Sequence, residues 1–273
     1  MLELHAHTTY SDGTLSPRDL VKAAAAAGVR ALAITDHDTI AGWKEAIATA
    51  ATLPHPMEII PGVELSVIEK GRSLHLLGFY PDPTIIQPLL HKQLEGRKRR
   101  VQKMVANLAD LGYPIKNPEA LITENAAPGR PHVAQALVTA GYIDRPQDAF
   151  DRWIGEGKPA YVPYEPLSMT NGLELLRASG AITSWAHPYL FRHGNIESMI
   201  PAMAAAGLMG LEVYHPTHTP SQQDRLTSLC RQWNLFKTGG SDYHGPAQDQ
   251  RHPLNYFNLP LGLLHSLKQA LSP

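Results

Sequence analysis

Short apolar runs alternate along the chain with segments in which apolar residues recur at helical spacing. The runs are continuous rather than broken at every second position, which is typical of strands buried on both faces of a parallel sheet. We expect seven such strands, at residues 2–7, 31–35, 58–67, 74–80, 181–186, 210–214 and 236–240. Because strands and helices alternate, the pattern predicts an α/β fold, and seven strands favour a barrel-like closure over an open sheet.

Residues 88–165 break this alternation, because every element expected there is a helix. The four expected helices lie at residues 89–111, 118–125, 131–140 and 146–154. Residues 88 to 131 contain 8 Lys and Arg against 4 Asp and Glu, whereas the whole chain carries 24 basic and 25 acidic residues. We therefore expect a barrel formed by residues 1–87 and 166–273, and a helical insert, residues 88–165, that determines substrate specificity.

Histidines and carboxylates gather where the expected strands end. The chain has 14 histidines against 5 phenylalanines, and histidine is the commonest metal ligand. The residues near strand ends are His5, His7, Asp12, Asp36, His37, Asp38, Glu64, His75, His187, Glu212, His215, Asp242 and His244. The carboxyl ends of barrel strands meet at one rim, where active sites are built. So many imidazoles and carboxylates exceed the needs of one ion and suit two or three divalent ions, with manganese favoured and zinc or iron as alternatives.

These residues lie in motifs that resemble the polymerase and histidinol phosphatase (PHP) family. The motifs occupy residues 5–14 (HAHTTYSDGT), 34–38 (ITDHD), 62–64 (GVE), 75–78 (HLLG), 186–188 (AHP) and 240–245 (GSDYHG). The resemblance implies a distorted barrel of seven β/α units. The helical insert and the sequence Gly-Arg-Pro-His at 129–132 resemble a branch that contains 3′,5′-nucleoside bisphosphate phosphatases and 5′→3′ exonucleases acting on short RNA.

The resemblance also implies which residues bind metal. One ion is expected at His5, His7, Glu64 and Asp242. A second shares Glu64 as a bridge and adds His75 and His187, and a third uses Asp12, His37 and His244. The nine-residue set is better defined by the resemblance than the assignment of each ligand to one ion.

Arginines of the insert are candidates for holding the substrate. On a helical wheel, Arg97 falls in the middle of the apolar stripe of residues 89–111, and Arg100 falls at its edge. An inward-facing guanidinium is costly unless it is paired, so Arg97 has two interpretations. It forms a buried salt bridge, or it grips a phosphate with its planar fork, and the basic insert favours the phosphate.

Five further positions complete the expected site. Arg130 and His132 open a helix, where they serve either local capping or, as the resemblance favours, phosphate binding. His215 either donates to the phosphate or lines the mouth of the site. Asp36 and Glu212 are expected to orient the ligand imidazoles. The remaining histidines are interpreted as ordinary surface residues: His55, His91, His193, His218, His252 and His265.

Together these features predict hydrolysis of a phosphate ester of a nucleotide or short RNA, with a metal-bound hydroxide as the attacking group. No serine or cysteine is placed as a nucleophile. One alternative is a phosphatase for a small molecule such as histidinol phosphate, and another is a non-catalytic metal-binding module. We expect a cytoplasmic protein with no membrane span, no secretory signal and no obligate protein partner. The reasons are that no apolar run reaches the length of a membrane span, that residues 1–7 do not resemble a signal peptide, and that a single cysteine suits a reducing compartment.

Overall fold

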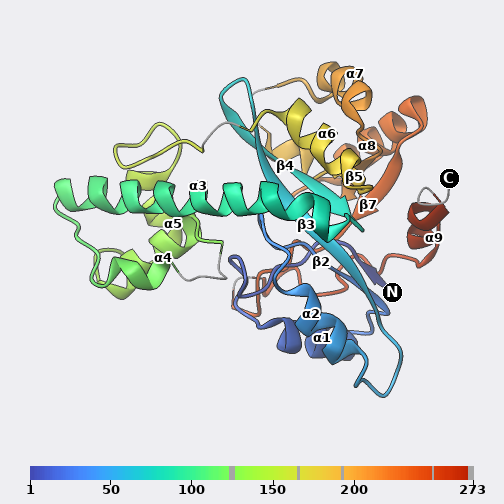
Figure 1. Ribbon diagram of the computed structural model, residues 1–273, viewed down its shortest axis with the longest axis horizontal. Helices are drawn as coiled ribbons and strands as arrows, with labels where there is room; N and C mark the ends of the chain where they lie inside the picture. The colour runs from blue at the N-terminus through green and yellow to red at the C-terminus, as the bar shows by residue number, and fades with distance from the viewer. Residues whose placement is uncertain (123–126, 165–166, 192–193, 248, 270–273) are drawn as a thin grey trace. The chain divides into compact units, whose positions relative to one another are not determined.

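The computed structural model describes residues 1–122, 127–164, 167–191, 194–247 and 249–269. Seven strands form one sheet in the order of the chain (Figure 1). They are β1 (Leu2–Glu3), β2 (Ala31–Ile34), β3 (Glu58–Glu69), β4 (Arg72–Phe79), β5 (Ile182–Trp185), β6 (Gly210–Tyr214) and β7 (Phe236–Gly239). The expected strand at residues 2–7 is shorter, so His5 and His7 follow β1 rather than belong to it.

The first and last strands are joined by backbone hydrogen bonds just beyond their ends. The amide of Leu4 donates to the carbonyl of Gly239 at 3.3 Å, and the amide of His7 donates to the carbonyl of Tyr243 at 2.8 Å. The amide of Tyr243 donates to the carbonyl of His5 at 3.3 Å. These bonds nearly close the sheet, which confirms the expected α/β barrel.

The strand β4 runs antiparallel to both of its neighbours, β3 and β5. The other pairs in the sheet are parallel, as expected. A two-residue turn, Lys70 and Gly71, joins β3 to β4, and both residues have positive φ angles of 50° and 76°. Such a turn matches the twist of a hairpin, so the expectation of a parallel β4 was wrong.

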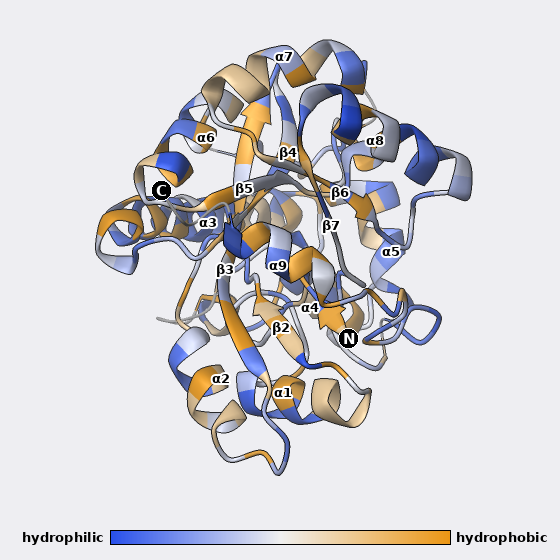
Figure 2. Ribbon diagram, turned by 90° about the vertical axis from the view of Figure 1, so that its right-hand side faces the viewer, coloured by the Kyte–Doolittle hydropathy of each residue, from blue (hydrophilic) through white to orange (hydrophobic). Residues whose placement is uncertain are grey.

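Helices cover the barrel strands and supply its outer core. They are α1 (Pro17–Ala26), α2 (Trp43–Ala50), α6 (Met169–Ala178), α7 (Ile196–Ala206), α8 (Pro220–Trp233) and α9 (Gly262–Gln269). Ser16 caps α1 by accepting a hydrogen bond from the amide of Asp19 at 3.1 Å. Leu20 and Val21 of α1 pack in one buried cluster with Ile34 of β2. Figure 2 shows largely hydrophobic strands beside helices that carry both hydrophobic and hydrophilic residues.

The chain divides into two compact units, residues 1–88 with 166–273 and residues 89–165. The elements at and within the second unit are α3 (Pro83–Asp110), η1 (Pro118–Leu121), α4 (Arg130–Thr139), α5 (Pro146–Ala149) and η2 (Phe150–Ile154). The second unit has a core of its own around Met104, Leu137 and Trp153. The helix expected at 118–125 is a short 3₁₀ helix that ends at Leu121, and residues 123–126 lie outside the described residues.

Across the described residues, we find no helix that combines the length and the apolar character needed to cross a membrane.

Candidate metal centre

The carboxylate of Glu64 lies at the centre of a cluster of imidazoles. Glu64 is 1% exposed and stands in the middle of β3, not at the end of a strand as the sequence indicated. Five imidazole nitrogens lie 2.8 to 3.2 Å from its two oxygens, and they belong to His5, His7, His37, His75 and His187. A single carboxylate with so many imidazole neighbours is well suited to bridge ions.

One group of four donors has the spacing of a metal coordination shell. Nε2 of His5 and Nε2 of His7 each lie 3.2 Å from Oε2 of Glu64 and 3.1 Å from Oδ1 of Asp242. Two donors that are each about 2.1 Å from one ion, at tetrahedral or octahedral angles, lie roughly 3.0–3.4 Å apart. The four side chains therefore fit one ion without rearrangement.

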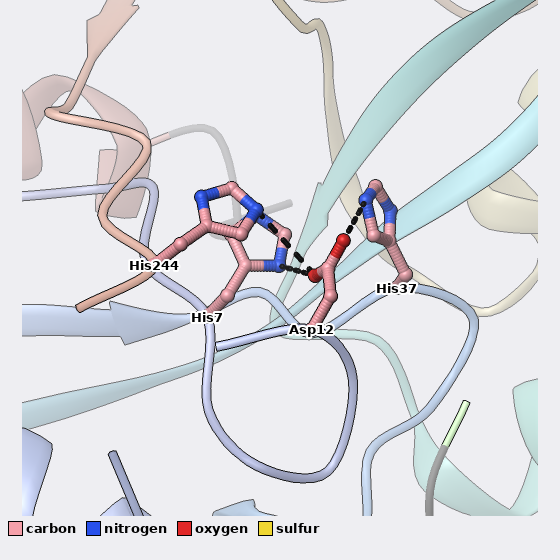
Figure 3. A group of neighbouring side chains, drawn as sticks. All are labelled: His7, Asp12, His37 and His244. Carbon is pink, nitrogen blue, oxygen red and sulfur yellow. Dashed lines mark ion pairs between the residues drawn. The ribbon is translucent and has the colours of Figure 1, made fainter. Parts of the chain in front are cut away.

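A second group surrounds Asp12 (Figure 3). Its Oδ1 lies 3.6 Å from Nδ1 of His7 and 3.4 Å from Nε2 of His244, and its Oδ2 lies 3.7 Å from Nε2 of His37. The sequence placed Asp12, His37 and His244 together, and the structure adds the second nitrogen of His7 to the same group. His7 thus faces two candidate ions, one with each ring nitrogen.

The third group shares Glu64 with the first. Oε1 of Glu64 lies 2.8 Å from Nδ1 of His75 and 2.9 Å from Nε2 of His187. His37 also approaches this group, since its Nδ1 lies 3.1 Å from Oε2 of Glu64. The structure thus brings all nine expected ligand residues together, and His37 joins either of two groups.

Several donor atoms in the cluster are buried but lack a hydrogen-bond partner within the described part of the chain. They include Nε2 of His5, Oδ1 of Asp12 and Nδ1 of His75. Each of these atoms nevertheless has an atom of an imidazole or carboxylate partner 2.8 to 3.6 Å away. A metal site requires buried nitrogen and oxygen atoms that face a common position and are not used up by hydrogen bonds. These residues therefore fit divalent ions.

In the absence of metal, imidazoles and carboxylates of the cluster shift one another's pKa values. Burial alone would lower the pKa of His7, but its hydrogen bonds to Asp242 and Glu64 and the nearby Asp12 raise that pKa to about 10. Burial would raise the pKa of Glu64, yet His37, His75 and His5 hold it well below its usual range. Protons and metal ions therefore compete for the same nitrogens.

Glu212 contacts two ligand residues from β6. Its Oε1 lies 2.9 Å from Nδ1 of His5, and its Oε2 accepts a hydrogen bond from the backbone amide of His187 at 2.7 Å. The contact with Nδ1 leaves Nε2 of His5 facing the other donors. This is the orienting contact that metal-bound imidazoles commonly receive from a carboxylate.

Asp36 was expected to orient imidazoles, but its direct partners are hydroxyls and an amide. It accepts hydrogen bonds from the amide and the hydroxyl of Thr8, both at 2.7 Å, and from the hydroxyl of Ser11 at 2.6 Å. The Ser11 hydroxyl in turn lies 3.3 Å from Nδ1 of His7. Asp36 therefore reaches a ligand through Ser11 and fixes the loop that begins at His7.

His215 is a buried residue whose side chain contacts Asp242. It is 3% exposed, so it does not line the mouth of the site. Its Nε2 lies 3.2 Å from Oδ2 of Asp242, and its Nδ1 lies 2.8 Å from the hydroxyl of Thr217. Since Oδ1 of Asp242 faces His5 and His7, the two oxygens of one carboxylate are both engaged.

His218 was interpreted as a surface residue, and this was wrong. The side chain is 5% exposed, its Nδ1 lies 3.0 Å from the carbonyl oxygen of Val213, and its ring centre lies 5.3 Å from that of His215. Burial is the main cause that lowers its pKa to about 4. His218 follows β6 in a loop without apolar periodicity, so the sequence contained no signal of its burial.

The helical unit contains a cluster of arginines and aromatic rings. Arg97 and Arg100 are each 3% exposed, and their guanidinium carbons lie 5.4 and 3.8 Å from the ring centre of Tyr164. That of Arg130 lies 5.9 Å from the ring centre of Tyr161. Burial lowers the pKa of Arg100, and the nearby Arg130 and Arg97 lower it further. Nη2 of Arg100 is buried without a hydrogen-bond partner among the described residues.

His132 has a local role in the structure. Its Nδ1 accepts a hydrogen bond from the amide of Gly129 at 3.0 Å, which caps the start of α4. This contact is the capping role that the sequence left open as the alternative to phosphate binding. The residue also borders a cavity of about 550 Å³ within the helical unit, together with Lys116 and Gln135.

A family model for the PHP domain matches residues 3–153, which include six of the nine residues of the cluster. The chain belongs to the PHP domain family. The remaining three residues of the cluster, His187, Asp242 and His244, are supplied by the second half of the barrel.

Relatives of this PHP protein cover nearly its whole length. A 5′-3′ exoribonuclease from Haemophilus influenzae is 34% identical over 249 residues, which are 90% of this chain and 90% of the relative. A 3′,5′-nucleoside bisphosphate phosphatase from Chromobacterium violaceum is 31% identical over 95% of this chain and 92% of its own. The solved structure of a protein from Bifidobacterium adolescentis, assigned provisionally as a metal-dependent phosphoesterase, is 31% identical. It superposes with a TM-score of 0.88 over 98% of this chain and 96% of the other.

Proposed function

We propose that this metal-dependent phosphoesterase removes a phosphate from nucleoside 3′,5′-bisphosphates and cleaves nucleotides from the 5′ end of short RNA. The main support for phosphoester hydrolysis is the cluster of nine imidazole and carboxylate side chains around Glu64. Two relatives with the corresponding activities in their names are similar to this chain over at least 90% of its length. The same donors are ordinary ligands for manganese, which we propose as the working metal.

Bound divalent ions would supply Lewis acidity for the phosphoryl oxygens and an activated water. The protein's own part is to hold the ions at fixed spacing. Glu64 would bridge, His5, His7 and Asp242 would complete one site, and Asp12 with His244 would hold another. We propose that His37, His75 and His187 complete the remaining coordination. His215 would keep Asp242 turned towards the ions.

The arginine cluster supports a substrate with a second phosphate. Arg97 and Arg130 both lower the pKa of the buried Arg100 by charge repulsion, and an anion would relieve that repulsion. Arg100 already donates from Nε to the carbonyl of Val162 at 2.7 Å, which leaves Nη2 for an anion. We propose that Arg97, Arg100 and Arg130 hold the phosphate that is not cleaved. Tyr161 and Tyr164 support their guanidinium groups.

The test is phosphate release from four substrates at saturating Mn²⁺. They are adenosine 3′,5′-bisphosphate, adenosine 3′-monophosphate, histidinol phosphate and a 5′-phosphorylated trinucleotide RNA, for which mononucleotide release is followed. We expect the highest kcat/KM on the bisphosphate or the RNA. Preference for histidinol phosphate would identify a small-molecule phosphatase instead, and no hydrolysis of any substrate by metal-loaded protein would indicate a non-catalytic module.

A further inference from the structure

Glu3 is a buried carboxylate that none of the candidate metal groups includes. It ends β1, is 2% exposed, and lies two residues before His5. Its Oε1 accepts a hydrogen bond from the amide of Ser241 at 2.7 Å. Its Oε2 accepts one from the Ser241 hydroxyl at 3.0 Å and one from the amide of Asn255 at 3.2 Å. A carboxylate is removed from water here in exchange for three specific bonds.

The loop held by Glu3 carries two candidate ligands. Ser241 directly precedes Asp242, and His244 follows three residues after Ser241. This loop lies beyond the end of β7, and Asp242 has a positive φ of 51°, which is uncommon for a residue other than glycine. Backbone hydrogen bonds between Tyr243 and both His5 and His7 hold the middle of the loop. The side chain of Glu3 holds its start at Ser241.

Gly240 shows how closely this loop approaches β1. A Cβ atom at position 240 would lie 2.5 Å from Oε1 of Glu3 and 2.6 Å from the backbone nitrogen of His5. Only a residue without a side chain fits at that distance. The segment that contains His5 and the loop that contains Asp242 thus meet directly, with the Glu3 carboxylate between them.

We propose that Glu3 is a positioning residue that fixes the Asp242–His244 loop at the distance the metal ions need. The inference rests on the proposed metal centre and adds a residue that the nine donors do not include. Oδ1 of Asp242 must stay 3.1 Å from Nε2 of His5 for both to reach one ion. Residues that orient metal ligands change metal affinity by about 10–100-fold when they are replaced.

The test compares Glu3→Gln with wild type in two measurements, Mn²⁺ affinity by competition with a chelator and Tm of the metal-free protein. Gln keeps an oxygen for the Ser241 amide, but the charge is lost and the other end of the group no longer accepts from Asn255. We expect at least about tenfold weaker Mn²⁺ binding. We expect the metal-free Tm to fall while the protein stays folded, because buried hydrogen bonds of the Glu3 carboxylate are lost. Glu58→Gln is the control for Mn²⁺ affinity, which should stay that of wild type. Glu58 accepts from the Tyr80 hydroxyl at 2.8 Å and from Lys268 Nζ at 2.7 Å, but its side chain is 36% exposed and holds no ligand loop.

Ser241→Ala provides a second, milder test, because it removes one of the two Ser241 bonds. We expect Ser241→Ala to bind Mn²⁺ about threefold more weakly than wild type. The double variant Glu3→Gln/Ser241→Ala should bind Mn²⁺ almost as well as Glu3→Gln alone, because the two changes disrupt the same contact. Unchanged Mn²⁺ affinity in Ser241→Ala would overturn the positioning role. Unchanged Mn²⁺ affinity in folded Glu3→Gln, whatever its Tm, would overturn it as well. If wild type itself bound no Mn²⁺, the proposed metal centre would fail instead.

Discussion

Oε1 of Glu212 lies 2.9 Å from Nδ1 of His5, and both side chains are fully buried. The other oxygen of Glu212 accepts a hydrogen bond from the amide of His187. A proton on Nδ1 of His5 therefore belongs to the contact with Glu212, and Nε2 is left to bind an ion. One carboxylate sets the tautomer of one candidate ligand and the backbone position of another.

Replacing this carboxylate should weaken metal binding without unfolding the protein. In Glu212→Gln a single oxygen must serve both His5 and His187, so we expect Mn²⁺ affinity to fall by about 10–100-fold. Competition titration with a chelator measures the change, and circular dichroism checks the fold. Glu174→Gln, an exposed position on α6, is the control. Equal affinities in the two variants would show that Glu212 does not orient the site.

The sequence predicted the barrel and the nine side chains that the structure brings together, but it did not predict the direction of β4. Short apolar runs look the same whether a strand is parallel or antiparallel to its neighbours. The turn did contain a signal, because a two-residue connection ending in glycine, Lys70-Gly71, favours a hairpin. The hairpin extends β3 past Glu64 to Glu69, which is why Glu64 lies within its strand and not at its end.

The supporting residues of the site were harder to predict than the ligands. Asp36 contacts Thr8 and Ser11 rather than an imidazole, and Glu3 holds a loop more than 200 positions away in the sequence. Such contacts depend on how distant segments meet, and no spacing rule within one segment encodes them. His218 is buried for the same reason, by packing against His215 and Tyr189.

The pKa of His7 predicts how metal-free protein responds to pH. Its folded value of about 10 exceeds the ordinary value of 6.5, so its contribution to stability is complete below pH 6.5 and is lost as the pH rises through about 10. The Tm of chelator-treated protein should therefore fall between pH 7 and pH 9. Bound Mn²⁺ replaces the proton, so the increase in Tm caused by Mn²⁺ should grow over the same range. An increase that is constant with pH would contradict this account.

His218 predicts an opposite effect on the acid side. Burial lowers its folded pKa to about 4, so its contribution to stability is present above pH 6.5 and is lost as the pH falls towards 4. A His218→Leu variant has no group to titrate there. We expect the Tm of wild type to fall relative to that of the variant as the pH is lowered from 7 to 4.5, in matched scans with chelator. A constant difference would mean that His218 is not buried as a neutral ring.

Arg97→Met tests the proposed contact with the second phosphate. The substitution keeps the apolar stem and removes the charge. We expect kcat/KM on a nucleoside 3′,5′-bisphosphate to fall by about 30-fold or more, since charge-assisted bonds contribute about 2–3 kcal/mol, and to change little on a 3′-monophosphate. Arg99→Met, at the exposed neighbouring position, is the control. Equal losses on both substrates would instead indicate a structural ion pair or a contact with the reacting phosphate.

The central claim is that the nine clustered side chains hold the ions that hydrolyse phosphate esters. The most direct measurement is the metal content of purified, active protein by elemental analysis, repeated for His5→Ala and Asp242→Ala. The account predicts two or three divalent transition-metal ions per wild-type chain. Each variant should retain fewer ions, keep its fold and lose nearly all phosphate release. Wild-type protein that is fully active without a bound transition metal would contradict it.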